Sequence, residues 1–189
     1  MATETNPQVG KPQVVVQLNL MVALSADLRS QVKQAHWNVV GENFIAIHKL
    51  LDELAATLLL QVDTYAERIR ALQAVPRGTA REAAKNSPLK EFPLTELDEA
   101  EAIRAVLERY EQYSGALTEA IDTCDKSEDM TTQDVFIEAQ RDVDLQAYFL
   151  RSHLGKSART ARPASKPAAR PASKPARAAS KPAVRPAKK

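Results

Sequence analysis

The residues best suited to chemistry in this sequence are two pairs of potential metal ligands within residues 43–72. His48 and Asp52 form the first pair, and Asp63 and Glu67 form the second. On an α-helix these four residues fall at roughly 0°, 40°, 60° and 100° around the axis, so they share one face. Each pair is spaced by four residues, which lets two side chains converge on one ion.

The two pairs cannot share an ion within one helix, because their midpoints lie roughly 22 Å apart along the axis. A second copy of the helix, antiparallel across a two-fold axis, would bring His48 and Asp52 of one chain opposite Asp63 and Glu67 of the other. That dimer would contain two equivalent metal sites with nitrogen and oxygen ligands. The competing interpretation is an ordinary solvated helix face, and spacing alone leaves both open.

A further histidine lies on the preceding segment. An apolar ridge with four-residue spacing runs from Leu20 to Val32, and His36 is the next step along it, which places the imidazole on or beside a buried face. Iron suits such a mixture of imidazole and carboxylate ligands. No Glu-x-x-His occurs in the sequence, which argues against the di-iron centre that ordinary ferritin-like bundles build within one subunit.

The elements that must position these residues are predicted to be helices. Only 5 of 189 residues are glycine, and good helix formers dominate the sequence. We expect long helices over residues 14–38, 43–72, about 95–123 and about 131–154, with a short connecting helix over 79–86. Four long helices with a long crossover between the second and third predict an all-α, ferritin-like four-helix bundle.

The starts of these helices are predicted from capping patterns. Asn43 and Thr79 are candidate N-caps of the second helix and the connecting helix. Thr95 followed by Asp98, and Thr131 followed by Asp134, resemble capping boxes and predict the starts of the last two long helices.

Charge divides the chain into an acidic body and a basic end. Residues 1–155 contain 15 Lys and Arg against 24 Asp and Glu, whereas residues 156–189 contain 11 Lys and Arg and no acid. Six of the 11 prolines lie in this last segment, each directly after Lys or Arg. We therefore expect three parts: a flexible arm over 1–13, the bundle over 14–155 and a disordered basic tail over 156–189.

The remaining composition bears on location. Cys124 is the only cysteine, so no intrachain disulfide can form and a reducing compartment is favoured. No apolar run approaches the ~18 residues of a membrane span, and the N-terminus lacks the pattern of a secretory signal. These features predict a cytoplasmic protein without a membrane partner.

The segments QAHWNVVGENFIAIHKLLDEL and VDTYAERIRAL resemble the signature of the Dps family, the DNA-binding miniferritins of starved bacteria. SPLKEFPL and DVFIEAQRDVDLQAYFLRSHL are similar to that family as well, and the likeness covers about residues 14–154. The resemblance implies a hollow dodecameric cage built from two-fold dimers. It also implies a site for two irons at each dimer interface, with His36, His48 and Asp52 from one subunit and Asp63 and Glu67 from its mate.

The activity that the resemblance implies is oxidation of iron(II), preferably by hydrogen peroxide, followed by storage of ferric mineral. Trp37 would lie beside the centre as a local electron donor, with a core aromatic as the alternative. Lys33, one turn before His36, could reach a carboxylate or remain a plain surface lysine. A line of carboxylates at the start of the last helix could form an iron-entry pore, or an ordinary solvated face: Asp134, Glu138 and Asp142.

The basic tail predicts binding to double-stranded DNA without sequence specificity, because it offers phosphate contacts but no aromatic or acidic side chain. A solubilising tail is the alternative. The cations concerned are Lys156, Arg159, Arg162, Lys166, Arg170, Lys174, Arg177, Lys181, Arg185, Lys188 and Lys189. The sequence is thus interpreted as a nucleoid-associated ferroxidase. A purely architectural nucleoid protein with a weak metal site, or a helical protein with structural zinc, would be the alternatives.

Overall fold

The computed structural model describes residues 11–154 of the chain. The expected basic tail and most of the expected N-terminal arm lie outside the described residues. The elements follow in the order α1 (Pro12–Asn38), β1 (Val39–Val40), α2 (Phe44–Ala71), α3 (Ala80–Asn86), β2 (Leu97–Asp98), α4 (Glu99–Lys126) and α5 (Met130–His153). The predicted all-α fold is confirmed, and the short α3 lies in the crossover where it was expected.

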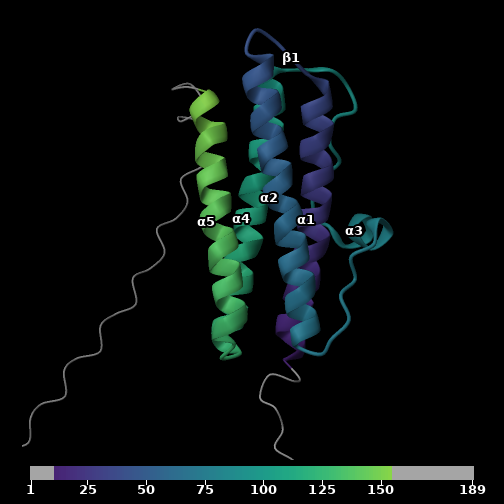
Figure 1. Cartoon of the computed structure of the whole chain (residues 1–189), viewed down its shortest axis with the longest axis vertical. Helices are drawn as coiled ribbons and strands as arrows, with labels where there is room; N and C mark the ends of the chain where they lie inside the picture. Colours follow the sequence, from purple (N-terminus) through teal and green to yellow (C-terminus); the bar gives the residue numbers. More distant parts are fainter. Residues whose placement is uncertain (1–10, 155–189) are drawn as a thin grey trace, which may run out of the picture.

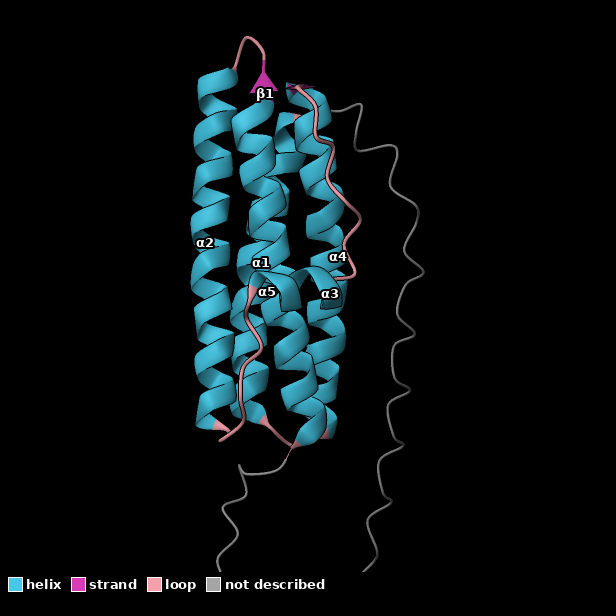
Figure 2. Cartoon of the chain, turned by 90° about the vertical axis from the view of Figure 1, so that its right-hand side faces the viewer, coloured by secondary structure: helices cyan, strands magenta, loops and turns pink. Residues whose placement is uncertain are grey.

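The four long helices stand side by side, and α3 lies across the outside of the bundle (Figures 1 and 2). α1 packs along α2 and α4 packs along α5, while α1–α4 and α2–α5 contacts join the two pairs. The crossover carries the chain from the end of α2 to the opposite end of the bundle, where α4 begins (Figure 1). α2 and α4 therefore both start at the same end.

The core is formed by the apolar faces that the helical periodicity predicted. Leu24, Leu28 and Val32 on α1 are fully buried, and so are Leu51 and Leu58 on α2. Full burial of such a side chain contributes about 1.5–3 kcal/mol, so these facing ridges hold the helices together. None of the helices within residues 11–154 combines the length and hydropathy that a bilayer crossing needs.

A buried polar chain crosses this apolar core. The hydroxyls of Tyr65 and Tyr113 lie 2.7 Å apart, and Tyr113 donates to Oε1 of Gln61 at 3.0 Å. Nε2 of Gln61 in turn donates to Oδ2 of Asp142 at 3.5 Å. Burial raises the pKa of Tyr65 and Tyr113 well above the ordinary value, so both phenols remain protonated and this chain joins α2, α4 and α5.

Several helix starts differ from their predicted positions. α1 begins at Pro12 rather than Val14, because proline, which lacks a backbone N–H, is well suited to the first turn of a helix. α4 begins after Asp98, which forms a capping box with Glu101 instead of acting as the partner of Thr95.

The last helix also begins earlier than the capping pattern predicted. α5 begins at Met130, within one residue of the expected position, but it is capped by Asp129, which accepts from the backbone N–H of Thr132, so the predicted capping pattern of Thr131 and Asp134 is wrong. Thr79 does cap α3 as predicted.

A two-residue parallel bridge at the end of the bundle was not predicted. Val39 pairs with Leu97 and Val40 with Asp98, which ties the α1–α2 turn to the start of α4. Sequence patterns give no signal for so short a pairing between distant segments.

Candidate metal centre

The two histidines of the predicted site are brought together by α1 and α2. Their rings stack with centroids 3.6 Å apart and an interplanar angle of 23°. His36 is buried at the end of α1, and His48 is half-buried near the start of α2. The tight turn between the antiparallel helices therefore brings the two imidazoles together, one buried and one half-buried.

Each imidazole is fixed by the backbone of the other histidine. Nδ1 of His36 lies 2.8 Å from the carbonyl oxygen of His48, and Nδ1 of His48 lies 3.0 Å from the carbonyl oxygen of His36. A carbonyl oxygen only accepts, so Nδ1 of both rings carries the proton. In the neutral rings Nε2 then keeps its lone pair, which is the form that binds a metal ion.

Asp52 follows His48 by one helical turn and is exposed. Its Oδ1 lies 2.7 Å from Nζ of Lys33 on α1. The hydrogen bond from Lys33 is the main reason that the pKa of Asp52 lies below its ordinary value, against a smaller opposing effect of burial. The carboxylate is therefore ionised at neutral pH and already paired with a cation.

Trp37 lies on the outside of α1. Its side chain is 67% exposed, and Nζ of Lys33 lies 5.7 Å from the centroid of the ring. The alternative that Trp37 is a core aromatic is therefore wrong, and so is the expectation that Lys33 is a plain surface lysine.

The second pair of predicted ligands lies on the same outward face of α2, further along the helix. Asp63 and Glu67 are exposed, whereas Leu51, Leu54 and Leu58 on the opposite face are buried. Within residues 11–154, no three His, Cys, Asp or Glu side chains lie close enough together to hold one ion. Within the described residues, the two predicted ligand pairs of α2 thus lie apart from each other, as helix geometry requires.

The remaining candidates are placed as follows. Asp134 and Glu138 are exposed on the first half of α5, while Asp142 is half-buried and accepts from Gln61. Cys124 is fully buried, and burial raises the pKa of its thiol to about 11, so it is unreactive near neutral pH. The cations predicted to bind DNA, Lys156 to Lys189, lie outside the described residues.

Comparison with known proteins identifies the class first. The family model described as "Ferritin-like domain" matches residues 15–160. Among solved structures, Dps from Staphylococcus aureus superposes with a TM-score of 0.74 at 28% identity, covering 78% of this chain and 98% of that one. Dps from Microbacterium arborescens, described as in the high iron form, gives a TM-score of 0.72 at 36% identity, covering 78% and 99%.

Sequence relatives narrow this class. The DNA protection during starvation protein of Agrobacterium fabrum is 36% identical over 148 residues, which are 78% of this chain and 91% of that protein. The protein of the same name from Mycolicibacterium smegmatis is 32% identical over 130 residues, 68% of this chain and 69% of that one. This chain belongs to the Dps family of ferritin-like proteins.

Proposed function

We propose that this chain is a ferroxidase whose metal sites form between two antiparallel copies of α2. One observation carries the proposal. His36 and His48 stack on each other with the lone pairs of their Nε2 atoms free of these contacts, and His48 and Asp52 share the outward face of α2 with Asp63 and Glu67, the pair that a complete site requires. In the dimer each site takes His36, His48 and Asp52 from one subunit and the other two carboxylates from its partner.

The outward face of α2 also carries the apolar surface that a dimer would bury. Ile45, Leu59 and Leu60 are 59%, 50% and 68% exposed. Leu59 and Leu60 lie between the two ligand pairs in sequence, so an antiparallel partner would cover them while it completes the sites. A solvated helix face does not account for this apolar surface.

The ligand set suits iron as substrate. Imidazole binds iron(II), and carboxylate oxygens tolerate the change to iron(III). Two iron(II) ions each give one electron to one hydrogen peroxide, the O–O bond breaks, and two protons complete two water molecules. Because both electrons leave together, no hydroxyl radical is released.

Family membership supports a proposal for the larger assembly. The proposed dimers build a dodecameric cage in which ferric mineral is stored, and iron enters through pores lined by Asp134, Glu138 and Asp142. The basic tail binds double-stranded DNA through its phosphates, which places the cage on the bacterial nucleoid in the cytoplasm. The name shared by the relatives, DNA protection during starvation, agrees with this role.

The decisive experiment is oxidation of iron(II) by hydrogen peroxide in wild type and in the double variant His36→Ala/Asp63→Ala. The double variant removes one ligand from each half of the site, so the proposal expects the rate to fall by at least about 100-fold. Equal rates would rule out the enzyme. Absence of an iron-dependent absorbance change in wild type would instead favour structural zinc.

One observation favours a second function, an architectural DNA-compacting protein with a weak metal site. The ammonium of Lys33 pairs with Asp52 at 2.7 Å, so it would compete with iron for this carboxylate. An architectural protein of this kind would compact DNA as well as the ferroxidase does. Its wild type would oxidise iron(II) no faster than the double variant His36→Ala/Asp63→Ala.

A further inference from the structure

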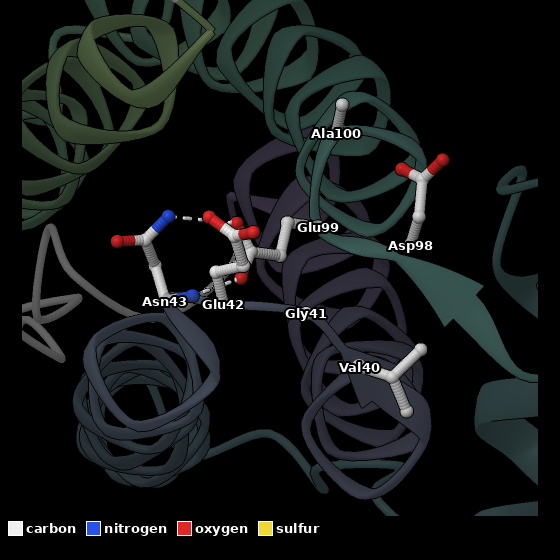
Figure 3. A pocket seen from close by; sticks show the side chains of 7 residues that line it. All are labelled: Val40, Gly41, Glu42, Asn43, Asp98, Glu99 and Ala100. Atoms are coloured by element: carbon white, nitrogen blue, oxygen red, sulfur yellow. Dashed lines mark hydrogen bonds between the residues drawn. The ribbon is translucent and has the colours of Figure 1, made fainter.

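The turn between the two histidines is held from outside the α1–α2 pair. Residues 39–43 connect the end of α1, where His36 lies, to the start of α2, where His48 lies. This turn lies against the first residues of α4, with Val40 paired to Asp98. Figure 3 shows the two segments facing each other, with Asn43 and Gly41 on one side and Glu99 on the other.

Glu99 makes the contacts that fix the start of α2. Its Oε1 accepts from the backbone N–H of Asn43, and its Oε2 accepts from Nδ2 of Asn43 at 3.1 Å (Figure 3). Asn43 occupies the N-cap position of α2, but its side chain makes no capping hydrogen bond, contrary to the prediction. The amide that would cap the helix is instead held by a carboxylate from α4.

Gly41 allows this carboxylate to approach. Its φ of +152° lies in a region that residues with a side chain rarely adopt, and a Cβ at this position would overlap the side chain of Glu99. Both the backbone conformation of this turn and the position of the Glu99 side chain favour glycine at residue 41, because Glu99 occupies the space that a Cβ would need.

The contacts continue from this anchor to the imidazoles. Phe44, the residue after Asn43, packs against His48 with ring centroids 4.9 Å apart. His48 and His36 then hold each other through their reciprocal Nδ1–carbonyl contacts. A shift at the start of α2 would therefore move the ring of His48. It would also move the carbonyl oxygen of His48, which fixes the ring of His36.

We propose that Glu99 is a positioning residue for the His36–His48 pair. It acts through Asn43 and the start of α2, not by contact with a metal ion. The inference rests on the proposed function, because it gives the histidine pair the role of ligands. Its consequence is that α4, which supplies none of the proposed ligands, sets the affinity of the site.

The test uses the full-length protein and Co(II) alone as the probe, since its d–d absorption reports the number and kind of ligands. Glu99→Ala is expected to weaken Co(II) binding about tenfold, the lower end of the range for groups that hold metal ligands, and to alter the d–d bands. Glu99→Gln should restore most of the affinity, because its carbonyl can still accept from the backbone N–H of Asn43. Hydrogen exchange of residues 39–48 should accelerate in Glu99→Ala and not in Glu99→Gln.

Two further variants separate positioning from general destabilisation. Glu101→Ala removes another carboxylate from the same turn of α4, which accepts from the backbone N–H of Asp98 and not from Asn43, and should leave Co(II) binding unchanged. Gly41→Ala keeps the carboxylate but displaces it, and should weaken binding as Glu99→Ala does. This variant also decides the matter if Glu99→Ala does not fold.

The outcomes distinguish the two hypotheses. If Glu99→Ala and Gly41→Ala bind Co(II) as tightly as wild type while His48→Ala does not bind it, the positioning role is wrong and the metal site stands. Equal weakening by Glu101→Ala and Glu99→Ala would also overturn the positioning role. If wild type and His48→Ala bind equally, the proposed metal site itself is wrong, and the role of Glu99 falls with it.

Discussion

At the scale of single residues, the contact with the most direct chemical consequence is the one between Lys33 and Asp52. It lies at the proposed site, its two atoms are 2.7 Å apart, and it satisfies a carboxylate that the metal would otherwise bind. Lys33 also lies near the face of Trp37, which places a cation, an electron-rich ring and a ligand in one group. A metal ion bound at the proposed site would therefore have to displace this ammonium from Asp52.

Replacement of Lys33 by methionine should strengthen metal binding, because it removes the competing ammonium and keeps the apolar stem. The gain is limited to about fivefold, since exposed ion pairs are weak. Titration with Co(II) measures it, and Lys85→Met, an exposed lysine on α3, is the control. A loss of affinity in Lys33→Met would mean that the lysine holds Asp52 in its binding position.

At the scale of elements, the helix caps hold the bundle at both ends. The cap of α5 is the most deeply packed: Asp129 accepts from Thr132 and pairs with Arg68 of α2 at 3.1 Å, with both charged side chains nearly buried. Asp98 caps α4 with a similar hydrogen bond but is exposed. The two aspartates make the same local contact with different burial.

Asp129→Ala should lower the free energy of unfolding by about 3 kcal/mol, because it removes a cap and leaves the charge of Arg68 buried without its partner. Asp98→Ala, the matched control, should cost about 1 kcal/mol. Urea denaturation at one fixed protein concentration compares them, since assembly adds to apparent stability. Equal losses would show that the pair with Arg68 adds nothing.

The effect of Asp129 should depend on pH with a defined sign. Burial acts to raise the pKa of this carboxyl, but hydrogen bonds from Thr132 and the charge of Arg68 outweigh it, so the pKa lies below 3.8. A carboxyl whose pKa is lowered in the folded state stabilises the fold at pH values above its ordinary pKa. This stabilisation is lost as the pH falls through the pKa of the folded state. The difference between wild type and Asp129→Ala should therefore be constant at neutral pH and shrink below about pH 4.

The sequence predicted the elements better than their connections. Periodicity identified α2 to within one residue at each end, because Leu51, Leu54 and Leu58 repeat at helical spacing for a long distance. The start of α4 was misplaced because Thr95–Asp98 and Asp98–Glu101 both fit a capping box, and only the pairing of Leu97 with Val39 selects the second.

The same distinction holds for the site. Spacing and family resemblance predicted that His36 and His48 would be neighbours, and the stacked rings agree, because each histidine lies on a helix whose face the periodicity defines. The role of Glu99 could not be inferred, because it lies 56 residues beyond Asn43 and meets it only through the packing of α4. Contacts between segments far apart in sequence leave no local pattern.

At the scale of the whole molecule, both proposed activities require more than one copy of the chain. The proposed iron site takes ligands from two subunits, and a single tail would offer only weak phosphate contacts. Assembly through α2 would complete the first, and a cage that displays many tails would multiply the second.

Leu60→Glu should break the dimer, because it places a charge on the apolar part of the proposed interface. Leu60 is 68% exposed in the single chain, so the fold itself should tolerate the change. Leu94→Glu, at a position 80% exposed in the crossover, is the control. We expect Leu60→Glu to lower the mass in solution and abolish iron oxidation, with an unchanged helical circular dichroism spectrum. A folded monomer that oxidises iron would contradict the two-subunit site.

Deletion of residues 156–189 should separate the two activities. The segment carries 11 positive charges and no acid, so its loss leaves a body with net charge −9 that DNA repels. The protein with its tail should bind duplex DNA with an affinity that falls steeply with salt concentration. For each phosphate contact, the affinity should fall roughly tenfold when the salt concentration rises tenfold. The truncated protein should lose DNA binding at low salt and keep its cage and its iron oxidation, because the tail supplies no ligand.

A protein with the same tail residues in scrambled order is the control, and it should bind like wild type, since phosphate contacts do not depend on order. Equal DNA binding by the truncated protein would place the DNA-binding surface on the body, and loss of binding in the scrambled tail would show that the spacing of its cations matters.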